Sequence, residues 1–387
     1  MRILHTSDWH IGKRLGRFDR MQEHREVLAE VVEIADEREV DLVLVSGDIF
    51  DRPAPPVDAL RLGLETLVRL GTRRPVVAVA GNHDSPDLFE TLAPLLRPMG
   101  VHLVGHLRRP HQGGLLGPDV LGVPAVVACF PFLREGRVID LLADAGTWYG
   151  QYADKVAGIS RIYSEALHEA AGDDLVSLLV AHFMVSGVKI DRGAPRGERE
   201  LHIGQAYAAT EHAVPPGPGY VAMGHIHAPQ EVPGAPVPAE YAGSLLPLDF
   251  GEAGESKRVV IVEAEPGSLA TRESVPISAG RRLARAAGSW DELDPREDLD
   301  DAYLDLTVET TAPEPALAEW ARERFEFLVH VRDRRLGGQT VARPERAGRG
   351  IDELFADYYR EAEKTSAPPA LLEAFREVYD EVVDAAG

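Results

Sequence analysis

The feature that most constrains the fold is a pattern that occurs five times: a short apolar run followed at once by side chains that bind metal ions. It occupies residues 3–10, 46–51, 80–84, 180–182 and 224–227. Near-continuous apolar runs such as Leu42–Val45 and Val76–Ala80 are typical of strands buried on both faces. Leucines at helical spacing between residues 60 and 68 indicate an amphipathic helix between these two runs. The sequence therefore predicts an α/β layered architecture with its polar site at the carboxyl ends of strands.

The residue types at these strand ends are those that hold divalent cations. The candidate metal ligands are Asp8, His10, Asp48, Asn82, His182, His225 and His227. A glycine before three of them allows the backbone to turn sharply and approach an ion. Asp8 and His10 are two residues apart, as are His225 and His227, and in an extended segment this spacing places both side chains on one face. One such motif is a weak signal, but five in chain order are a strong one.

This ligand set suits the hydrolysis of a phosphoester. Two cations about 3.5–4 Å apart can activate water and stabilise charge on the entering and leaving oxygens. Asp48 is the candidate for the carboxylate that bridges them. Mixed imidazole, carboxylate and amide ligation favours Mn²⁺, Fe²⁺ or Zn²⁺ over Mg²⁺ or Ca²⁺. His83, beside Asn82, is the candidate general acid, and Asp51 is expected to orient His83 and hold it protonated.

Composition limits the class of protein and raises one conflict. Hydrophobic residues make up 44% of the 387 residues, which is enough for a substantial core. The net charge of −22 argues against a nucleic-acid partner, although it also promotes solubility. The sequence has no run of eighteen apolar residues, so we expect no membrane span. It has no Gly-rich loop of the ATPase type, so we expect no unaided ATP hydrolysis.

The expected compartment is the cytoplasm. Polar residues appear by position five, which leaves no apolar core for a signal peptide. A single cysteine, Cys129, cannot form an internal disulfide and lies in an apolar run, where it is expected to be a buried hydrophobe.

A change of character near residue 265 predicts further domains. We expect a main domain over 1–267, a small α+β domain over 268–338, a Gly/Arg-rich linker over 339–350 and a helical pair over 351–387. The two helices of the pair each carry an apolar stripe. The stripes consist of Ile351, Leu354, Phe355, Tyr358 and Ala362, and of Leu371, Leu372, Phe375, Val378, Tyr379 and Val382.

The five segments resemble those of the calcineurin-like metallophosphoesterase superfamily. Within it, the opening His5–Lys13 is similar to that of SbcD, the family of nuclease subunits of bacterial SbcC–SbcD complexes and the bacterial relative of the meiotic-recombination-eleven nucleases. Further similarity lies in residues 47–51, 81–84, 241–244, 248–252 and 256–257. The resemblance implies a four-layer α/β sandwich with a small α+β capping domain and C-terminal helices.

The resemblance also implies how the ligands divide. Asp8, His10, Asp48 and His227 would hold one ion, and Asp48, Asn82, His182 and His225 would hold the other. The usual ion of the family is Mn²⁺ rather than Mg²⁺, and His83 is its catalytic histidine.

By the same resemblance, the expected activity is that of a 3′→5′ exonuclease on double-stranded DNA and an endonuclease on single strands or hairpins. It would serve DNA break processing, replication and recombination. The helical pair would grip an SbcC-like ATPase at its coiled coil, with a homodimer of this chain inside a heterotetramer. The capping domain would contact DNA. Candidate contact residues are Arg14, Arg17, Arg108, Arg109, Arg281, Arg282, Arg285, Arg332, Arg334 and Arg335.

Two alternatives remain open from the sequence. The first is a phosphodiesterase or nucleotidase of the same superfamily that acts on a small phosphoester, which the acidic charge favours slightly. The second is a structural subunit whose metals only brace a partner ATPase, which a complete ligand set argues against. The histidines without a partner motif are expected on the surface or in packing: His24, His102, His106, His111, His168, His202, His212 and His330. His5, within the first strand, is expected in the core.

Overall fold

The computed structural model describes residues 1–133, 152–188, 208–209, 213–312 and 314–336, with short segments between 355 and 375. The chain divides into two compact units, one formed by Met1–Thr310 with Glu314–Arg334, the other by Thr311–Pro313 with Arg335–Gly387. The expected linker over 339–350 lies outside the described residues, as do His202 and His212.

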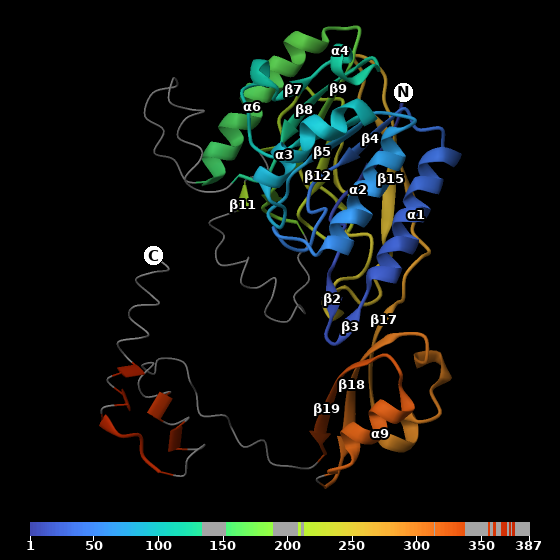
Figure 1. Cartoon of the computed structure of the whole chain (residues 1–387), viewed down its shortest axis with the longest axis vertical. Coiled ribbons are helices and arrows are strands. Elements are labelled where there is room, and N and C mark those ends of the chain that lie inside the picture. The colour runs from blue at the N-terminus through green and yellow to red at the C-terminus, as the bar shows by residue number, and fades with distance from the viewer. Residues whose placement is uncertain are drawn as a thin grey trace. The chain divides into compact units, whose positions relative to one another are not determined.

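Among the described residues, the first sheet of the larger unit has six strands, of which β4, β5 and β15 are labelled in Figure 1. In spatial order they are β16 (Thr271–Pro276), β15 (Arg258–Glu263), β1 (Arg2–Thr6), β4 (Leu42–Val45), β5 (Val76–Val79) and β6 (Val101–Val104). The strands β1, β4, β5 and β6 run parallel to one another. At the edge beside β1, β15 pairs antiparallel with β1, and β16 pairs antiparallel with β15. Because β16 pairs along its whole length with β15, this sheet extends past residue 267, where turn residues had suggested that the main domain ends.

The second sheet also has six strands, and its central strands are parallel. In spatial order they are β13 (Gln230–Glu231), β14 (Ala239–Tyr241), β12 (Tyr220–Gly224), β9 (Val176–His182), β8 (Ala125–Phe130) and β7 (Leu115–Leu116). Alternate residues of both sheets meet in one apolar layer, in which Leu44 and Val79 of the first sheet lie with Val180 and Ala222 of the second.

Helices cover the outer faces of both sheets. The first sheet packs on α1 (Met21–Glu37), α2 (Val57–Gly71) and α3 (Pro86–Leu96). The second sheet packs on α6 (Tyr152–Ala171), labelled in Figure 1. This helix buries Val156, Ile159 and Tyr163 against the sheet. Helix, sheet, sheet and helix make the expected four-layer sandwich. Residues such as Leu4 and Ile3 of β1 face opposite layers, which explains why the buried strands read as continuous apolar runs.

A third, smaller sheet belongs to the same compact unit. Its strands, in order, are β17 (Leu283–Gly288), β18 (Tyr303–Thr310) and β19 (Leu328–Arg335). The helices α8 (Trp290–Leu293) and α9 (Leu317–Arg324) cover one face of this sheet, where they pack on Leu304, Leu306 and Val308 of β18. At its other face Leu283 and Tyr303 pack with Leu15, at the hairpin of β2 (Arg14–Leu15) and β3 (Phe18–Asp19).

The described residues of the smaller unit are helical at 355–356, 359–360, 369, 371–372 and 374–375. The rings of Phe355 and Phe375 stack with centroids 4.0 Å apart and planes 5° from parallel. One residue from each predicted stripe therefore contacts the other, so the two stripes meet at this point. The remaining residues of both stripes, apart from Leu371 and Leu372, lie outside the described residues.

Candidate metal centre

The seven predicted ligands come from five strand ends and converge at one edge of the sandwich. Asp8 and His10 follow β1, Asp48 follows β4, Asn82 follows β5, His182 ends β9, and His225 and His227 follow β12. Parallel strands bring their carboxyl ends to the same edge of a sheet, and the two sheets place these edges together. The ligands from β1, β4 and β9 are nearly inaccessible to solvent: Asp8, His10, Asp48 and His182 are at most 2% exposed.

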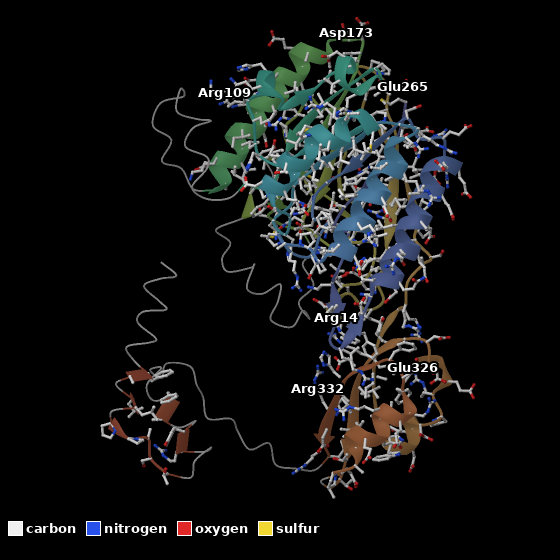
Figure 2. All side chains as sticks on the ribbon, viewed as in Figure 1. Arg14, Arg109, Asp173, Glu265, Glu326 and Arg332 are labelled. Carbon is white, nitrogen blue, oxygen red and sulfur yellow. The ribbon has the colours of Figure 1, made fainter. Side chains whose placement is uncertain are left out.

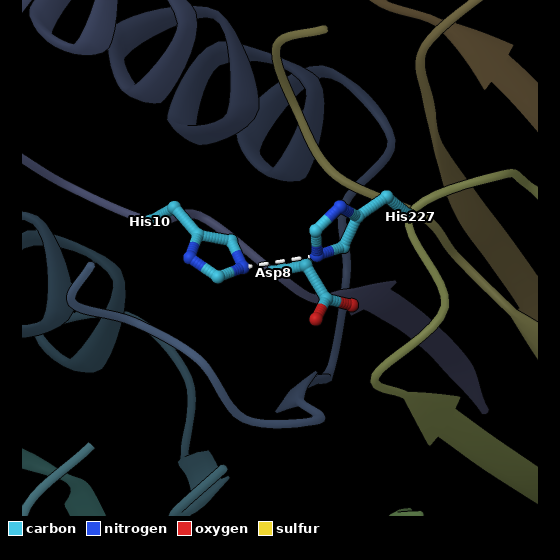
Figure 3. A group of neighbouring side chains, drawn as sticks. All are labelled: Asp8, His10 and His227. Carbon is cyan, nitrogen blue, oxygen red and sulfur yellow. Dashed lines mark hydrogen bonds between the residues drawn. The ribbon is translucent and has the colours of Figure 1, made fainter. Parts of the chain in front are cut away.

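The donor atoms form two neighbouring groups. Asp8, His10 and His227 place one ligand atom each within 4.8 Å of one another, as do Asp8, Asp48 and His182. His10 Nε2 lies 3.1 Å from His227 Nε2 (Figure 3). On the other side, Asn82 Oδ1 accepts hydrogen bonds from His182 Nε2 at 3.0 Å and His225 Nδ1 at 2.9 Å.

Asp48, a member of the second group, also lies close to the first. Its Oδ2 is 3.6 Å from His10 Nε2 and 3.4 Å from His182 Nε2, one imidazole from each group. Such a position suits a carboxylate that bridges two cations and offsets their mutual repulsion. Carboxylate, imidazole and amide donors of this kind fit Mn²⁺, Fe²⁺ or Zn²⁺.

The backbone around these ligands is strained. Among the described residues, five that are not glycine have positive φ, and four of them are predicted ligands: Asp8 at 50°, His10 at 44°, Asp48 at 52° and His225 at 100°. The left-handed region is costly for residues with a Cβ and is concentrated at functional sites. The expectation of extended segments is therefore wrong, because left-handed backbone at Asp8, His10 and His225, rather than strand pleating, aims these side chains.

Glycines make room for this packing. A Cβ on Gly81 would lie 2.1 Å from Asp48 Oδ1, and one on Gly47 would lie 2.3 Å from His182 Nδ1. Main-chain bonds then fix the turns, since the N–H groups of Asp8 and His10 donate to the carbonyls of Gly47 and Asp48 at 3.0 Å.

Protonation in the metal-free site follows from burial and charge. Burial opposes ionisation of Asp48, but the neighbouring His182 and His10 outweigh it and hold the pKa of that carboxyl well below its usual range. Burial would lower the pKa of His182, yet Asp48 and Asp8 raise that pKa to about 9. Burial keeps the pKa of His10 well below its ordinary value despite Asp48. At neutral pH the metal-free centre therefore holds an ionised Asp48 beside a protonated His182.

This proton must leave before His182 can bind an ion, which sets a pH dependence. Because the raised pKa of His182 is about 9, a proton competes with the ion at every pH below that value. We expect the Mn²⁺ affinity of the site that His182 would serve to rise about tenfold per pH unit between pH 6.5 and 8.5 and to level off above pH 9. Calorimetry under nitrogen, in buffers of different ionisation enthalpy, would measure both the affinity and the released proton. A flat profile would contradict a protonated His182 in the metal-free centre.

His83 lies at the rim of the same centre. Its backbone N–H donates to Asp48 Oδ1 at 2.8 Å, and its ring lies edge-on to that of His10 with centroids 4.7 Å apart. The ring Nδ1 donates to the main-chain carbonyl of Asp51 at 2.8 Å. The partner of the ring is therefore the backbone carbonyl of Asp51 and not the carboxylate that the sequence had suggested.

The Asp51 carboxylate has other neighbours. It lies 3.8 Å from His10 Nδ1, 3.3 Å from Lys13 Nζ and 3.9 Å from an Arg52 guanidinium nitrogen. These two cations border the metal centre, and sequence reasoning did not single them out. The signal was present, since Lys13 belongs to the opening segment and Arg52 directly follows Asp51.

Three further residues support the ligands from behind. The Asp84 carboxylate accepts hydrogen bonds from the backbones of Gly81, Ile49 and Phe50, tying the β4 and β5 turns together. His5 bonds to Tyr220 and Ser46 within the core, as a packing residue should. Glu252 accepts a hydrogen bond from His227 Nδ1 at 3.0 Å, and sequence reasoning assigned it no role.

Several of the arginines proposed as DNA contacts form ion pairs with carboxylates. Arg14 pairs with Asp19, Arg108 with Glu90, both Arg285 and Arg332 with Asp305, and Arg334 with Glu309. Arg281 lies 3.4 Å from the centroid of the Phe327 ring. Figure 2 shows Arg14 at the β2–β3 hairpin and Arg332 on the third sheet. Their surroundings do not remove the conflict between an acidic chain and a polyanionic substrate.

Fold and site together define a metallophosphoesterase, and comparison with known proteins agrees. The sequence profile of the calcineurin-like phosphoesterase family matches residues 1–229. The SbcD subunit of nuclease SbcCD from Bacillus subtilis (strain 168) is 34% identical over 349 residues, 86% of this chain and 85% of the relative. The SbcD subunit from Rhodobacter capsulatus is 31% identical over 90% of this chain and 89% of the relative. That of Escherichia coli (strain K12) is 31% identical over 74% and 71%.

The chain therefore belongs to the calcineurin-like phosphoesterases and, within them, to the SbcD family of nuclease subunits. It is a metal-dependent phosphodiester hydrolase. In the part of the chain that the structure describes, every helix is too short or too polar to cross a bilayer.

Proposed function

We propose that the chain is a Mn²⁺-dependent DNA nuclease subunit that acts in the cytoplasm with an SbcC-like ATPase. It would cleave double-stranded ends as a 3′→5′ exonuclease and single strands or hairpins as an endonuclease. The observation that carries the hydrolytic part is the position of Asp48 Oδ2 between an imidazole of each donor group. The relatives that are SbcD subunits of nuclease SbcCD support the substrate and the partner.

In this proposal the ligands are divided between two ions as the family resemblance implies. Asp8, His10, Asp48 and His227 would bind one, and Asp48, Asn82, His182 and His225 the other. When bound, two divalent ions supply charge neutralisation and water activation for phosphodiester hydrolysis. They also bring more positive charge than Asp8 and Asp48 carry negative, so the centre becomes locally attractive to a phosphate on an acidic protein.

His83 would serve the leaving group. Because the Asp51 carbonyl only accepts, the proton of the neutral ring sits on Nδ1 and leaves Nε2 as a base. To donate a proton from Nε2, the ring must carry protons on both nitrogens. Lys13 and Arg52, held by the Asp51 carboxylate, would place two more cations beside the same phosphate.

A cleavage assay tests the nuclease proposal against the small-substrate alternative. Plasmid, hairpin and duplex substrates would be incubated with Mn²⁺, with and without an SbcC-like ATPase and ATP, beside cyclic nucleotides and bis(p-nitrophenyl) phosphate. We expect DNA cleavage whose rate falls steeply with salt, because phosphate contacts release counterions. Turnover of small phosphoesters with intact DNA would favour the phosphodiesterase alternative.

The helical pair over 351–387 would bind the ATPase. Helices of this length are marginal alone in water, and an amphipathic pair suits binding to another helical protein. The stacked rings of Phe355 and Phe375 hold the two described helical segments together. This would preform the surface that a coiled coil contacts, with a homodimer of the chain inside a heterotetramer.

Deletion of residues 345–387 should separate the two activities. We expect Mn²⁺-dependent cleavage of single-stranded DNA to persist, while ATP-stimulated cleavage of duplex ends and co-purification with the ATPase are lost. Phe355→Asp with Phe375→Asp should behave as the deletion does, because a carboxylate within the stacked pair opposes its formation. Pull-down and nuclease assays on the same preparations would decide this. Binding of the shortened chain to the ATPase at full affinity would refute the assignment.

A further inference from the structure

The predicted ligand His227 is held from behind by a buried carboxylate. Glu252, 3% exposed, lies 25 residues further along the chain, and its Oε1 accepts from His227 Nδ1 at 3.0 Å. A carboxylate that accepts this bond keeps the ring proton on Nδ1. The opposite nitrogen, Nε2, then keeps its lone pair. It lies 3.1 Å from Nε2 of His10, another predicted metal ligand.

The Glu252 carboxylate is itself held in place by three donors on its other oxygen. Lys257 Nζ donates to Oε2 at 2.7 Å, the Leu248 N–H at 3.0 Å and Ser244 Oγ at 3.2 Å. Lys257 is 5% exposed and also donates to the His227 carbonyl at 3.1 Å. The ion pair therefore grips His227 at both its ring and its backbone. A buried pair with its hydrogen bonds satisfied in this way is rigid.

The turn that carries Glu252 is anchored on its other side by the third sheet. Glu252 ends a short 3-10 turn over Phe250–Glu252, and Phe250 is 3% exposed. Phe250 packs with Leu283 and Tyr303 of that sheet. Just before the turn, the Pro247 carbonyl accepts from the buried Arg20 guanidinium. Glu252 thus occupies a fixed position between the third sheet and the metal centre.

We propose that Glu252, anchored by Lys257, is a positioning residue that fixes the tautomer and orientation of His227 so that Nε2 is presented to an ion. The inference rests on the proposed metal centre and adds a residue to it. Carboxylate partners of metal-binding histidines are worth about 10- to 100-fold in metal affinity. They act through the histidine, without touching the ion or the substrate.

Glu252→Gln and Glu255→Gln form a matched pair, because both carboxylates lie 2.7 Å from the Lys257 ammonium while the bond to His227 Nδ1 comes from Glu252. In Glu252→Gln the ammonium retains the amide oxygen, so the amide NH₂ faces Nδ1 and drives the ring proton to Nε2. We expect Mn²⁺ affinity at one of two sites to fall about 10- to 100-fold. Glu255→Gln should bind both ions as the unmodified chain does.

Calorimetry and Mn²⁺ electron paramagnetic resonance would measure binding in the absence of substrate, and nitrogen NMR would identify the His227 tautomer in the metal-free chain. If Glu252→Gln does not fold, Glu252→Leu with Lys257→Met removes the pair without leaving a buried charge and should show the same loss. Unchanged two-site affinity in a folded variant, or equal losses in both members of the matched pair, would overturn the inference. An unmodified chain that binds two ions yet leaves DNA intact would count against the proposed nuclease function alone.

Discussion

Asp48→Asn should reduce bound Mn²⁺ from two ions to at most one and lower DNA cleavage by about 10³-fold or more, since each ion supplies several kcal/mol of transition-state stabilisation. The reason is the position of Asp48 Oδ2, within 3.6 Å of an imidazole in each donor group. An amide has the same shape but no charge to offset the repulsion between two cations. Metal analysis by mass spectrometry after gel filtration, together with a cleavage assay, would measure both effects.

The same substitution changes the metal-free protein. With the Asp48 charge removed, the pKa of His182 should fall from about 9, because burial still lowers it and its strongest charged partner is gone. Circular dichroism would establish that the variant is folded, so that ion loss cannot be attributed to unfolding. A folded Asp48→Asn chain that retains two ions would show that the bridge is made by another residue.

His83→Gln should leave both ions bound while cleavage falls by about 10²- to 10⁴-fold, the usual contribution of a general acid. His83 lies close enough to His10 and Asp48 to be a ligand by distance alone. Its Nδ1 is occupied by the Asp51 carbonyl, which leaves Nε2 for the leaving group. Metal content therefore separates the two roles, since a ligand would take an ion with it and an acid would not.

Asp51→Asn is the matched control for His83→Gln. It keeps the main-chain carbonyl that bonds to His83 and removes the charge near Lys13 and Arg52. We expect both ions to remain and the activity loss to be much smaller than in His83→Gln. A loss as large as that of His83→Gln would mean that His83 depends on the Asp51 carboxylate and not only on the backbone carbonyl. Loss of an ion in His83→Gln would show that His83 is a ligand.

The sequence by itself determined the chemistry and its location. Seven metal-binding side chains behind buried apolar runs predicted an α/β layered architecture with a site at strand ends, and the structure brings all seven together there. The prediction was possible because a buried strand and the residue types at its end can both be recognised within a short stretch of sequence. A run such as Leu42–Val45 is buried whichever partner covers it, and parallel strands deliver their ends to one edge.

Only the tertiary structure decided the contacts that depend on turns and distant partners. The left-handed turns at Asp8 and Asp48, and the use of the Asp51 carbonyl in place of its carboxylate, follow from local backbone geometry that side-chain spacing does not encode. Glu252 meets His227 across 25 residues, and His10 meets His227 across 217. The physical reason is that a hydrogen bond requires two groups at about 3 Å in a fixed orientation, and only the folded chain sets that distance.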